Sequence, residues 1–171
     1  MLLYLIRHAD AVSFQEDPNR PLSLRGVDEA RRVAEFFAKN GGLKPAEVWH
    51  SPLQRARETA QHIASGTNFR GPVREIDGII PEDDPNVIIQ RLEKSRGLPA
   101  VAVVGHEPHL SSVATRLLYP NADKEIFFEI AKCSVLAFEG QSDSPKIPLR
   151  WTNLWHIATA LLPVTEAGFK V

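Results

Sequence analysis

The sequence predicts a three-layer α/β/α fold, in which helices cover both faces of a mostly parallel central sheet. Two apolar runs indicate the sheet: residues 2–6 (LLYLI) and 100–105 (AVAVVG) are continuously hydrophobic. Strands buried on both faces have this composition, whereas half-exposed strands alternate polar and apolar residues. Helix-like periodicity between these runs indicates the covering layers.

The first predicted helix follows the first strand. Residues 24–39 repeat apolar side chains at helical spacing, with Ser23 placed to cap the N-terminus. Gly41 and Gly42 follow its end, where a left-handed residue is favoured. A short strand is then predicted at residues 46–50 (AEVWH).

The second predicted helix begins at the stretch SPLQ. Ser51 is interpreted as its N-cap, Pro52 as a first-turn residue, and Gln54 as the partner that closes a capping box. The same logic predicts a helix from Asp84-Pro85 to about Ser95. The remaining expected elements are a strand at 72–76, a helix that starts at Glu107-Pro108, and two last strands at 133–138 and about 153–162.

Composition limits the class of protein. The 171 residues are enough for one domain with a sizeable core, and the net charge of −1 argues against a general nucleic-acid or membrane-surface binder. Cys133 is the only cysteine, so no intramolecular disulfide forms, which is typical of a reducing compartment. The first apolar run is too short for a signal peptide or a membrane span. We therefore expect a cytoplasmic protein.

Basic and imidazole side chains follow three of the predicted strands. Arg7 and His8 end the first strand, Arg55 lies in the first turn of the helix after the second, and His106 follows the valine-rich strand. Parallel strands end at one edge of a sheet, and ligands of α/β proteins bind there. These four side chains are therefore expected to converge.

Arg55 indicates what this edge binds. A cation in the first turn of a helix is unfavourable against the helix dipole by roughly 0.3–1 kcal/mol. An anion bound there would meet both the helix N-terminus and the guanidinium, whose planar fork matches phosphate. An alternative is a surface ion pair of Arg55 with Glu58.

A phosphate site with two histidines suggests covalent catalysis. A neutral imidazole can attack phosphorus and hold the phosphoryl group, while arginines and the second histidine stabilise charge on its oxygens. The second ring nitrogen of the attacking histidine would donate to a backbone carbonyl and set the tautomer.

Three stretches, LIRHADA, SPLQRARET and VVGHEPHLS, resemble the signatures of the histidine phosphatase superfamily, and most closely its small SixA-type phosphohistidine phosphatases. The resemblance covers most of residues 1–140. It implies the phosphoglycerate mutase-like fold as a single domain over 1–171 without a cap insertion. It also implies His8 as nucleophile, a phosphate pocket of Arg7, Arg55 and His106, and no metal or other cofactor. Ala9 replaces the glycine that usually follows Arg-His.

Other residues have weaker assignments. Arg20 is expected at the rim of the site or against the substrate. Larger superfamily members use an acidic residue to protonate the leaving group, and Glu82 is the candidate here because Asp84 is better explained as a helix cap. Asp10 is a candidate to orient Arg7 or His8.

The resemblance and the short loops between the motifs favour a protein substrate. No lid is evident, and an open site admits a phosphorylated side chain of a folded protein, by resemblance a phosphohistidine on a histidine phosphotransfer domain. Hydrolysis of small phosphomonoesters, mutase activity and a non-catalytic phosphohistidine-binding module remain alternatives.

Two further mechanisms fit the sequence less well. A metallophosphatase would draw on His8, Asp10, His106 and His109, but His-Glu-Pro-His lacks the His-Glu-x-x-His spacing that puts two ligands on one helix face. A cysteine phosphatase would need an arginine six residues after Cys133, where Glu139 stands.

Overall fold

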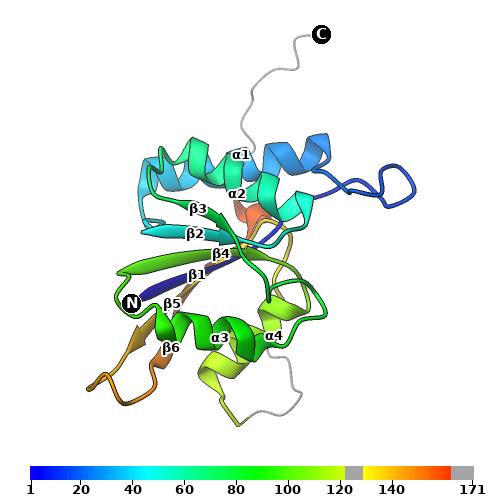
Figure 1. The fold of residues 1–171 in the computed structure, drawn as a ribbon. Helices are drawn as coiled ribbons and strands as arrows, with labels where there is room; N and C mark the ends of the chain where they lie inside the picture. Colours follow the sequence, from blue (N-terminus) through cyan, green and yellow to red (C-terminus); the bar gives the residue numbers. More distant parts are fainter. Residues whose placement is uncertain (122–128, 163–171) are drawn as a thin grey trace.

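The computed structural model describes residues 1–121 and 129–162. A six-stranded sheet with strand order β3-β2-β4-β1-β5-β6 forms the centre of the molecule (Figure 1). The parallel strands are β1 (Leu2–Arg7), β2 (Glu47–His50), β3 (Val73–Glu75) and β4 (Ala100–Gly105). The antiparallel strands are β5 (Val135–Gln141) and β6 (Arg150–Ile157).

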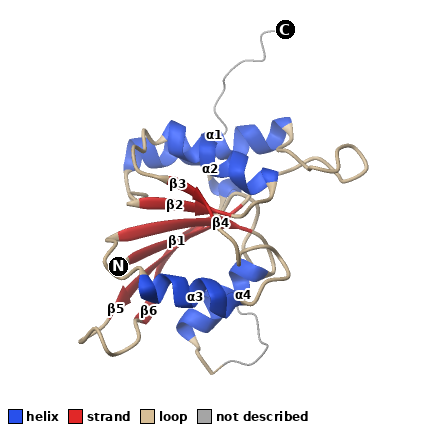
Figure 2. Cartoon of the chain, viewed as in Figure 1, coloured by secondary structure: helices blue, strands red, loops and turns tan. Residues whose placement is uncertain are grey.

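Helices cover both faces of this sheet, as the sequence predicts. Figure 2 shows α1 (Leu24–Asn40) and α2 (Gln54–Gly66) on one face, and α3 (Pro85–Lys94) and α4 (His109–Leu118) on the other. A single 3-10 turn, η1 (Thr159–Leu161), follows β6. No helix in the described residues is long and apolar enough to cross a membrane.

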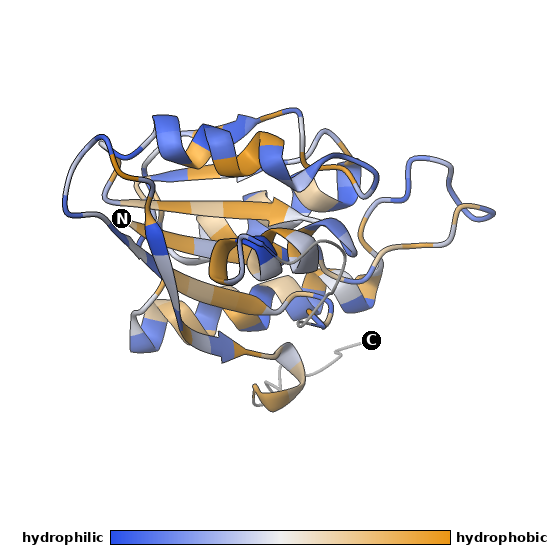
Figure 3. Cartoon of the chain, turned by 90° about the horizontal axis from the view of Figure 1, so that it is seen from below, coloured by the Kyte–Doolittle hydropathy of each residue, from blue (hydrophilic) through white to orange (hydrophobic). Residues whose placement is uncertain are grey.

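The uninterrupted apolar strands are explained by two cores. In β1, Tyr4 and Ile6 pack into the core under α1 and α2, whereas Leu3 and Leu5 pack into the core under α3 and α4. Both faces of the central strands are therefore buried, and no polar alternation is possible. Figure 3 shows these strands in hydrophobic orange and the outer helix faces largely in blue.

Most of the predicted helix ends are confirmed. The Ser23 hydroxyl accepts the Gly26 N–H at 3.0 Å, and Gly41 ends α1 with φ of 70°. The Asp84 carboxylate accepts the Asn86 N–H at 2.9 Å, so its role as the α3 cap is also confirmed.

Three local predictions are wrong. Ser51 does not cap α2, which begins at Gln54 after Leu53 and has no side-chain cap. Gln54 closes no capping box, because its amide donates to Glu58 at 2.7 Å. The last two strands also lie elsewhere than expected: β5 begins two residues later than the predicted strand, and β6 ends at Ile157 before the 3-10 turn.

Candidate active site

The sheet brings the four predicted residues to one edge. Arg7 is the last residue of β1 and pairs in register with Gly105, the last residue of β4, so His8 and His106 follow neighbouring strand ends. Their imidazole rings are 5.0 Å apart between centroids. Arg55 reaches the same place from the first turn of α2, and its Nε lies 3.3 Å from Nε2 of His8.

The hydrogen bonds of His8 identify its tautomer. Its Nδ1 lies 2.6 Å from the carbonyl oxygen of Ala9, which can only accept, so Nδ1 carries the proton. Nε2 is then unprotonated and accepts the Nε–H of Arg55. An unprotonated Nε2 is what a histidine nucleophile needs, and the guanidinium beside it is a cation that a phosphoryl group could contact.

The surroundings of His8 keep it neutral. Burial, which is the largest cause, and the nearby positive charges of Arg55, Arg7 and Lys132 together lower its pKa to about 4, against an opposing contribution from the Ala9 hydrogen bond. Only 7% of the residue is exposed. The imidazole is therefore uncharged at neutral pH.

His106 is held by a residue whose role the sequence reasoning missed. The Ser51 hydroxyl lies 2.6 Å from Nε2 of His106 and accepts the Leu53 N–H at 3.2 Å. The other ring nitrogen, Nδ1, is buried without a hydrogen-bond partner among the described residues. Burial, followed by the charges of His8 and Arg55, lowers the pKa of His106 to about 2. Nδ1 is thus the nitrogen left for a ligand.

Arg7 and Arg55 also have hydrogen-bond donors without a partner in the described residues. Arg7 donates from Nη1 to the Ile130 carbonyl at 2.7 Å, while its buried Nε has no partner in the described residues. Arg55 is buried and has no ion pair in the described part of the chain. Burial lowers its pKa, and so does the charge of Arg20. Such unmatched cationic donors favour an anion between them.

The surface ion pair with Glu58, which is the alternative assignment of Arg55, does not form. Instead Glu58 accepts the backbone N–H of Leu22 at 2.7 Å, while its other oxygen binds Gln54. Glu58 therefore anchors the segment before α1 to the start of α2. The sequence does not reveal this role of Glu58, because its partner is a backbone group 36 positions away.

Arg20 and Glu82 lie close enough to Arg55 to change its pKa, and they act in opposite directions. The charge of Arg20 lowers the pKa of Arg55, and the charge of Glu82 raises it. Arg20 has a left-handed backbone, with φ of 50°, and its Nε donates to the Val12 carbonyl at 3.2 Å. Glu82 is exposed.

Asp10 does not orient Arg7 or His8, contrary to expectation. Its carboxylate binds Lys132 at 2.5 Å and the Ser23 hydroxyl at 2.6 Å. Because Lys132 precedes Cys133, whose N–H bonds to the Arg7 and His8 carbonyls, this ion pair ties the segment before β5 to the end of β1. It supports the backbone of the site.

Thr59 is a second support that sequence reasoning missed. Its buried hydroxyl accepts the Ala9 N–H at 3.0 Å and donates to the Arg55 carbonyl at 2.7 Å. One hydroxyl therefore links the backbone next to His8 to the turn of α2 that carries Arg55. Its position one helical turn after Arg55 is the only sequence signal.

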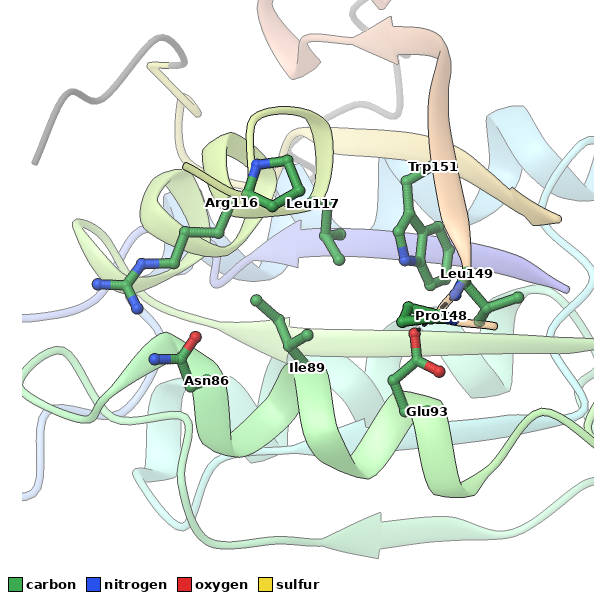
Figure 4. Close-up of a pocket in the computed structure, with 9 residues that line it drawn as sticks. Asn86, Ile89, Glu93, Arg116, Leu117, Pro148, Leu149 and Trp151 are labelled. Carbon is green, nitrogen blue, oxygen red and sulfur yellow. Dashed lines mark hydrogen bonds between the residues drawn. The ribbon is translucent and has the colours of Figure 1, made fainter. Parts of the chain in front are cut away.

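A separate groove lies between α3, α4 and the start of β6 (Figure 4). Its apolar lining includes Ile89 and Trp151, and it contains none of the four strand-end residues. Its charged groups already have partners: Arg116 pairs with Asp84 at 3.5 Å, and Glu93 accepts the Leu149 N–H at 3.0 Å. The groove is thus distinct from the candidate active site formed by Arg7, His8, Arg55 and His106.

Comparisons with known proteins agree with this geometry. Residues 3–80 match the family model of the histidine phosphatase superfamily (branch 1). An uncharacterized protein of Picosynechococcus sp. is 31% identical over 125 residues, which cover 70% of this chain and 74% of that protein. The phosphohistidine phosphatase SixA of Escherichia coli is 26% identical over 138 residues, covering 79% and 84% of the two chains.

Solved structures show the same fold. The protein histidine phosphatase SixA, in complex with tungstate, superposes with a TM-score of 0.79 at 22% identity, over 94% of this chain and 98% of that one. A mycobacterial glucosyl-3-phosphoglycerate phosphatase superposes with a TM-score of 0.67 at 15% identity, over 89% and 96% of the chains. From its motifs, its fold and these relatives, the chain belongs to the histidine phosphatase superfamily, in which its likeness is to the SixA type.

Proposed function

We propose that this phosphatase hydrolyses phosphohistidine on a protein, through a covalent phosphohistidine on His8. The observation that carries the proposal is the pair of contacts at His8: Nδ1 bonds to the Ala9 carbonyl at 2.6 Å, and Nε2 faces Arg55 at 3.3 Å. They leave an unprotonated nitrogen directed at a cationic pocket. A phosphoryl group bound there would lie between the nucleophile and the groups that stabilise its charge.

Arg7, Arg55 and His106 are the proposed phosphate pocket. The unpartnered Nε of Arg7 supplies one buried donor, and the guanidinium of Arg55 supplies a second group. Nδ1 of His106 supplies a third donor in the tautomer in which the Ser51 hydroxyl donates to Nε2. Donors that are already oriented need no reorganisation when charge spreads over the equatorial oxygens in the transition state. A tetrahedral oxyanion, tungstate, is bound in the SixA structure of similar fold.

The proposed reaction has two steps. The Nε2 lone pair of His8 attacks phosphorus, the phosphorus–nitrogen bond of the substrate breaks, and the released imidazole nitrogen takes up a proton. Water then attacks the phosphoryl group on His8, which releases inorganic phosphate and regenerates the free imidazole. Glu82 is the proposed proton source in the first step, since it is an exposed carboxyl group within electrostatic reach of Arg55.

An open site supports a protein substrate over a small one. The segments 8–23, 51–53, 76–84 and 106–108 separate the parallel strands from the helices that follow them, and none of the four contains a further helix or strand, so we propose a single domain with no inserted lid. A histidine phosphotransfer domain is the proposed partner. Hydrolysis of a small phosphate ester is the second candidate, since a neighbour of the same fold is a glucosyl-3-phosphoglycerate phosphatase.

Rapid-quench labelling tests the proposal. Wild type and His8→Ala would be mixed in EDTA with a histidine phosphotransfer domain that carries radiolabelled phosphohistidine. We expect a transient label on the wild-type enzyme that is lost in acid and stable in base, and neither label nor turnover with His8→Ala. His62→Ala is the matched control, because His62 lies two turns along α2 from Arg55; it should behave as wild type.

Each other outcome rejects a stated part of the proposal. Phosphate release without an enzyme label would reject the covalent step and favour direct attack by water. Loss of activity in EDTA, restored by a divalent cation, would favour a metallophosphatase. Activity on small esters with no phosphohistidine protein hydrolysed would reject the substrate class.

A further inference from the structure

The segment between β1 and α1 forms an ordered arm, residues 11–22. Figure 1 shows it as the dark-blue loop that projects from the body of the molecule. Its two sides pair at the base, through a bridge between Ala11 and Leu22 and a 3.0 Å bond from the Val12 N–H to the Pro21 carbonyl. The arm therefore has the beginning of a hairpin.

Hydrogen bonds also order the tip of the arm. The N–H groups of Glu16 and Asp17 bond to the Ser13 carbonyl at 3.2 and 3.1 Å. The Asp17 carboxylate accepts the Asn19 N–H at 2.8 Å, and its carbonyl accepts the Arg20 N–H at 2.9 Å. Phe14 thus stands on a backbone with a defined turn.

The arm presents apolar side chains to solvent. Phe14 is 63% exposed, and Leu24, the first residue of α1 just beyond the arm, is 87% exposed. These side chains contribute little to folding, because burial in the core is what makes large apolar groups stabilising. Exposed apolar groups on an ordered support are typical of protein-binding surfaces, where aromatic residues dominate the energy.

The base of the arm is joined to the candidate active site. Glu58 of α2 binds the Leu22 N–H at 2.7 Å, one turn of helix from Arg55. The charge of Arg20, on the same arm, acts on the Arg55 guanidinium. A protein that places a phosphorylated side chain against Arg55 therefore also has a surface beside the base of the arm, whereas a free phosphorylated amino acid has no such surface.

We propose that the arm is a docking element for the phosphoprotein substrate, and that Phe14 and Leu24 pack against an apolar surface beside its phosphorylated side chain. This inference rests on the proposed function and extends it: besides the phosphohistidine, the enzyme would also recognise the protein surface around it. Binding energy from the arm would raise the specificity for phosphoproteins without changing the chemistry at His8.

The test compares one chemical bond in two settings. A histidine phosphotransfer domain carrying phosphohistidine and the free amino acid phosphohistidine would be hydrolysed by wild type, Phe14→Ala and Phe14→Leu. We expect wild type to have a higher kcat/KM on the domain than on the free amino acid. Phe14→Ala should lose roughly tenfold in kcat/KM on the domain and nothing on the free amino acid. Phe14→Leu should retain most of its kcat/KM on both substrates. Ile147→Ala is the matched control: Ile147 is 48% exposed in the loop after β5, near the beginning of β1.

The outcomes distinguish a docking role of the arm from a role in the reaction at His8. Equal loss on both substrates would show that Phe14 supports the site and would overturn docking, as would an unchanged rate of Phe14→Ala on the domain. A wild-type enzyme that hydrolyses both substrates equally well would also overturn it. A wild-type enzyme that hydrolyses neither would reject the proposed function, and the docking inference with it.

Discussion

We expect Arg55 to contribute to catalysis and to contribute nothing, or an unfavourable amount, to the free energy of unfolding. Replacing Arg55 should therefore lower kcat/KM without lowering the stability of the fold. The side chain is buried, has no ion pair in the described residues, and forms one hydrogen bond there, from Nε to His8 at 3.3 Å. Burial, with the charge of Arg20 next, lowers its pKa, which means that the surroundings of Arg55 disfavour its charged form. Arg55→Met removes this charge and keeps an apolar stem of similar length.

The magnitudes follow from these surroundings. Arginines that stabilise charge in phosphoryl transfer are worth roughly 10³-fold or more, so we expect Arg55→Met to lower kcat/KM by about that factor. A factor of 10³ corresponds to about 4 kcal/mol of transition-state stabilisation. Removing an uncompensated buried cation should leave the free energy of unfolding unchanged or raise it by up to about 1 kcal/mol.

The assay combines kinetics with thermal unfolding. Initial rates on phosphohistidine give kcat/KM, and melting curves with and without tungstate report anion binding, since a ligand of the folded state raises Tm. Wild type should melt higher with tungstate, and Arg55→Met should show little shift. A variant that unfolds more easily without tungstate and keeps its rate would refute this reasoning, because Arg55 would then be a structural residue.

Three further predictions concern two supports of the site, Ser51 and Thr59, and the protonation state of His8. Ser51→Ala leaves His106 without its 2.6 Å partner, so kcat/KM should fall roughly tenfold and the free energy of unfolding by about 1–3 kcal/mol in urea titrations. Thr59→Val leaves the buried Ala9 N–H unpaired and should lower the free energy of unfolding by a similar 1–3 kcal/mol in the same titrations, whereas an unchanged value would mean that the bond contributes nothing. NMR titration should find His8 neutral, with its proton on Nδ1, down to about pH 4. Since the unfolded chain takes up that proton near pH 6.5, stability should decrease as pH falls from about 6.5 toward 4; a folded pKa near 6.5 would contradict both statements.

Local signals accounted for the fold class and the four strand-end residues. Continuous apolar runs in β1 and β4 identified the central strands, since only strands buried on both faces need that composition. Arg7, His8 and His106 directly follow those runs, so the parallel topology was sufficient to bring them to one edge. Helix caps such as Ser23 and Asp84 were also predictable, because a cap bonds to a backbone group within three residues.

Ser51 shows where local signals failed. Its place before Pro52 fits an N-cap, yet its hydroxyl binds Nε2 of His106, 55 positions along the chain. The same hydroxyl also accepts the Leu53 N–H, a local bond that does not cap α2. The bond to His106 depends on the packing of α2 against β4, which the local sequence does not reveal. Asp10 is a similar case, since its nearest cations in sequence are not its partners.

The sequence by itself therefore determined the layered fold, the edge of the sheet that holds the site, and the residue types that gather there. These properties depend on hydrophobic periodicity and on the position of residues relative to strand ends, both of which are local. Only the tertiary structure identified the Ala9 carbonyl as the group that sets the tautomer of His8. It alone also revealed the unpartnered nitrogens of Arg7 and His106, the supports from Ser51 and Thr59, and the exposed Phe14 on the arm. Hydrogen bonds and desolvation depend on groups that are distant in sequence, so they exist only once the chain has folded.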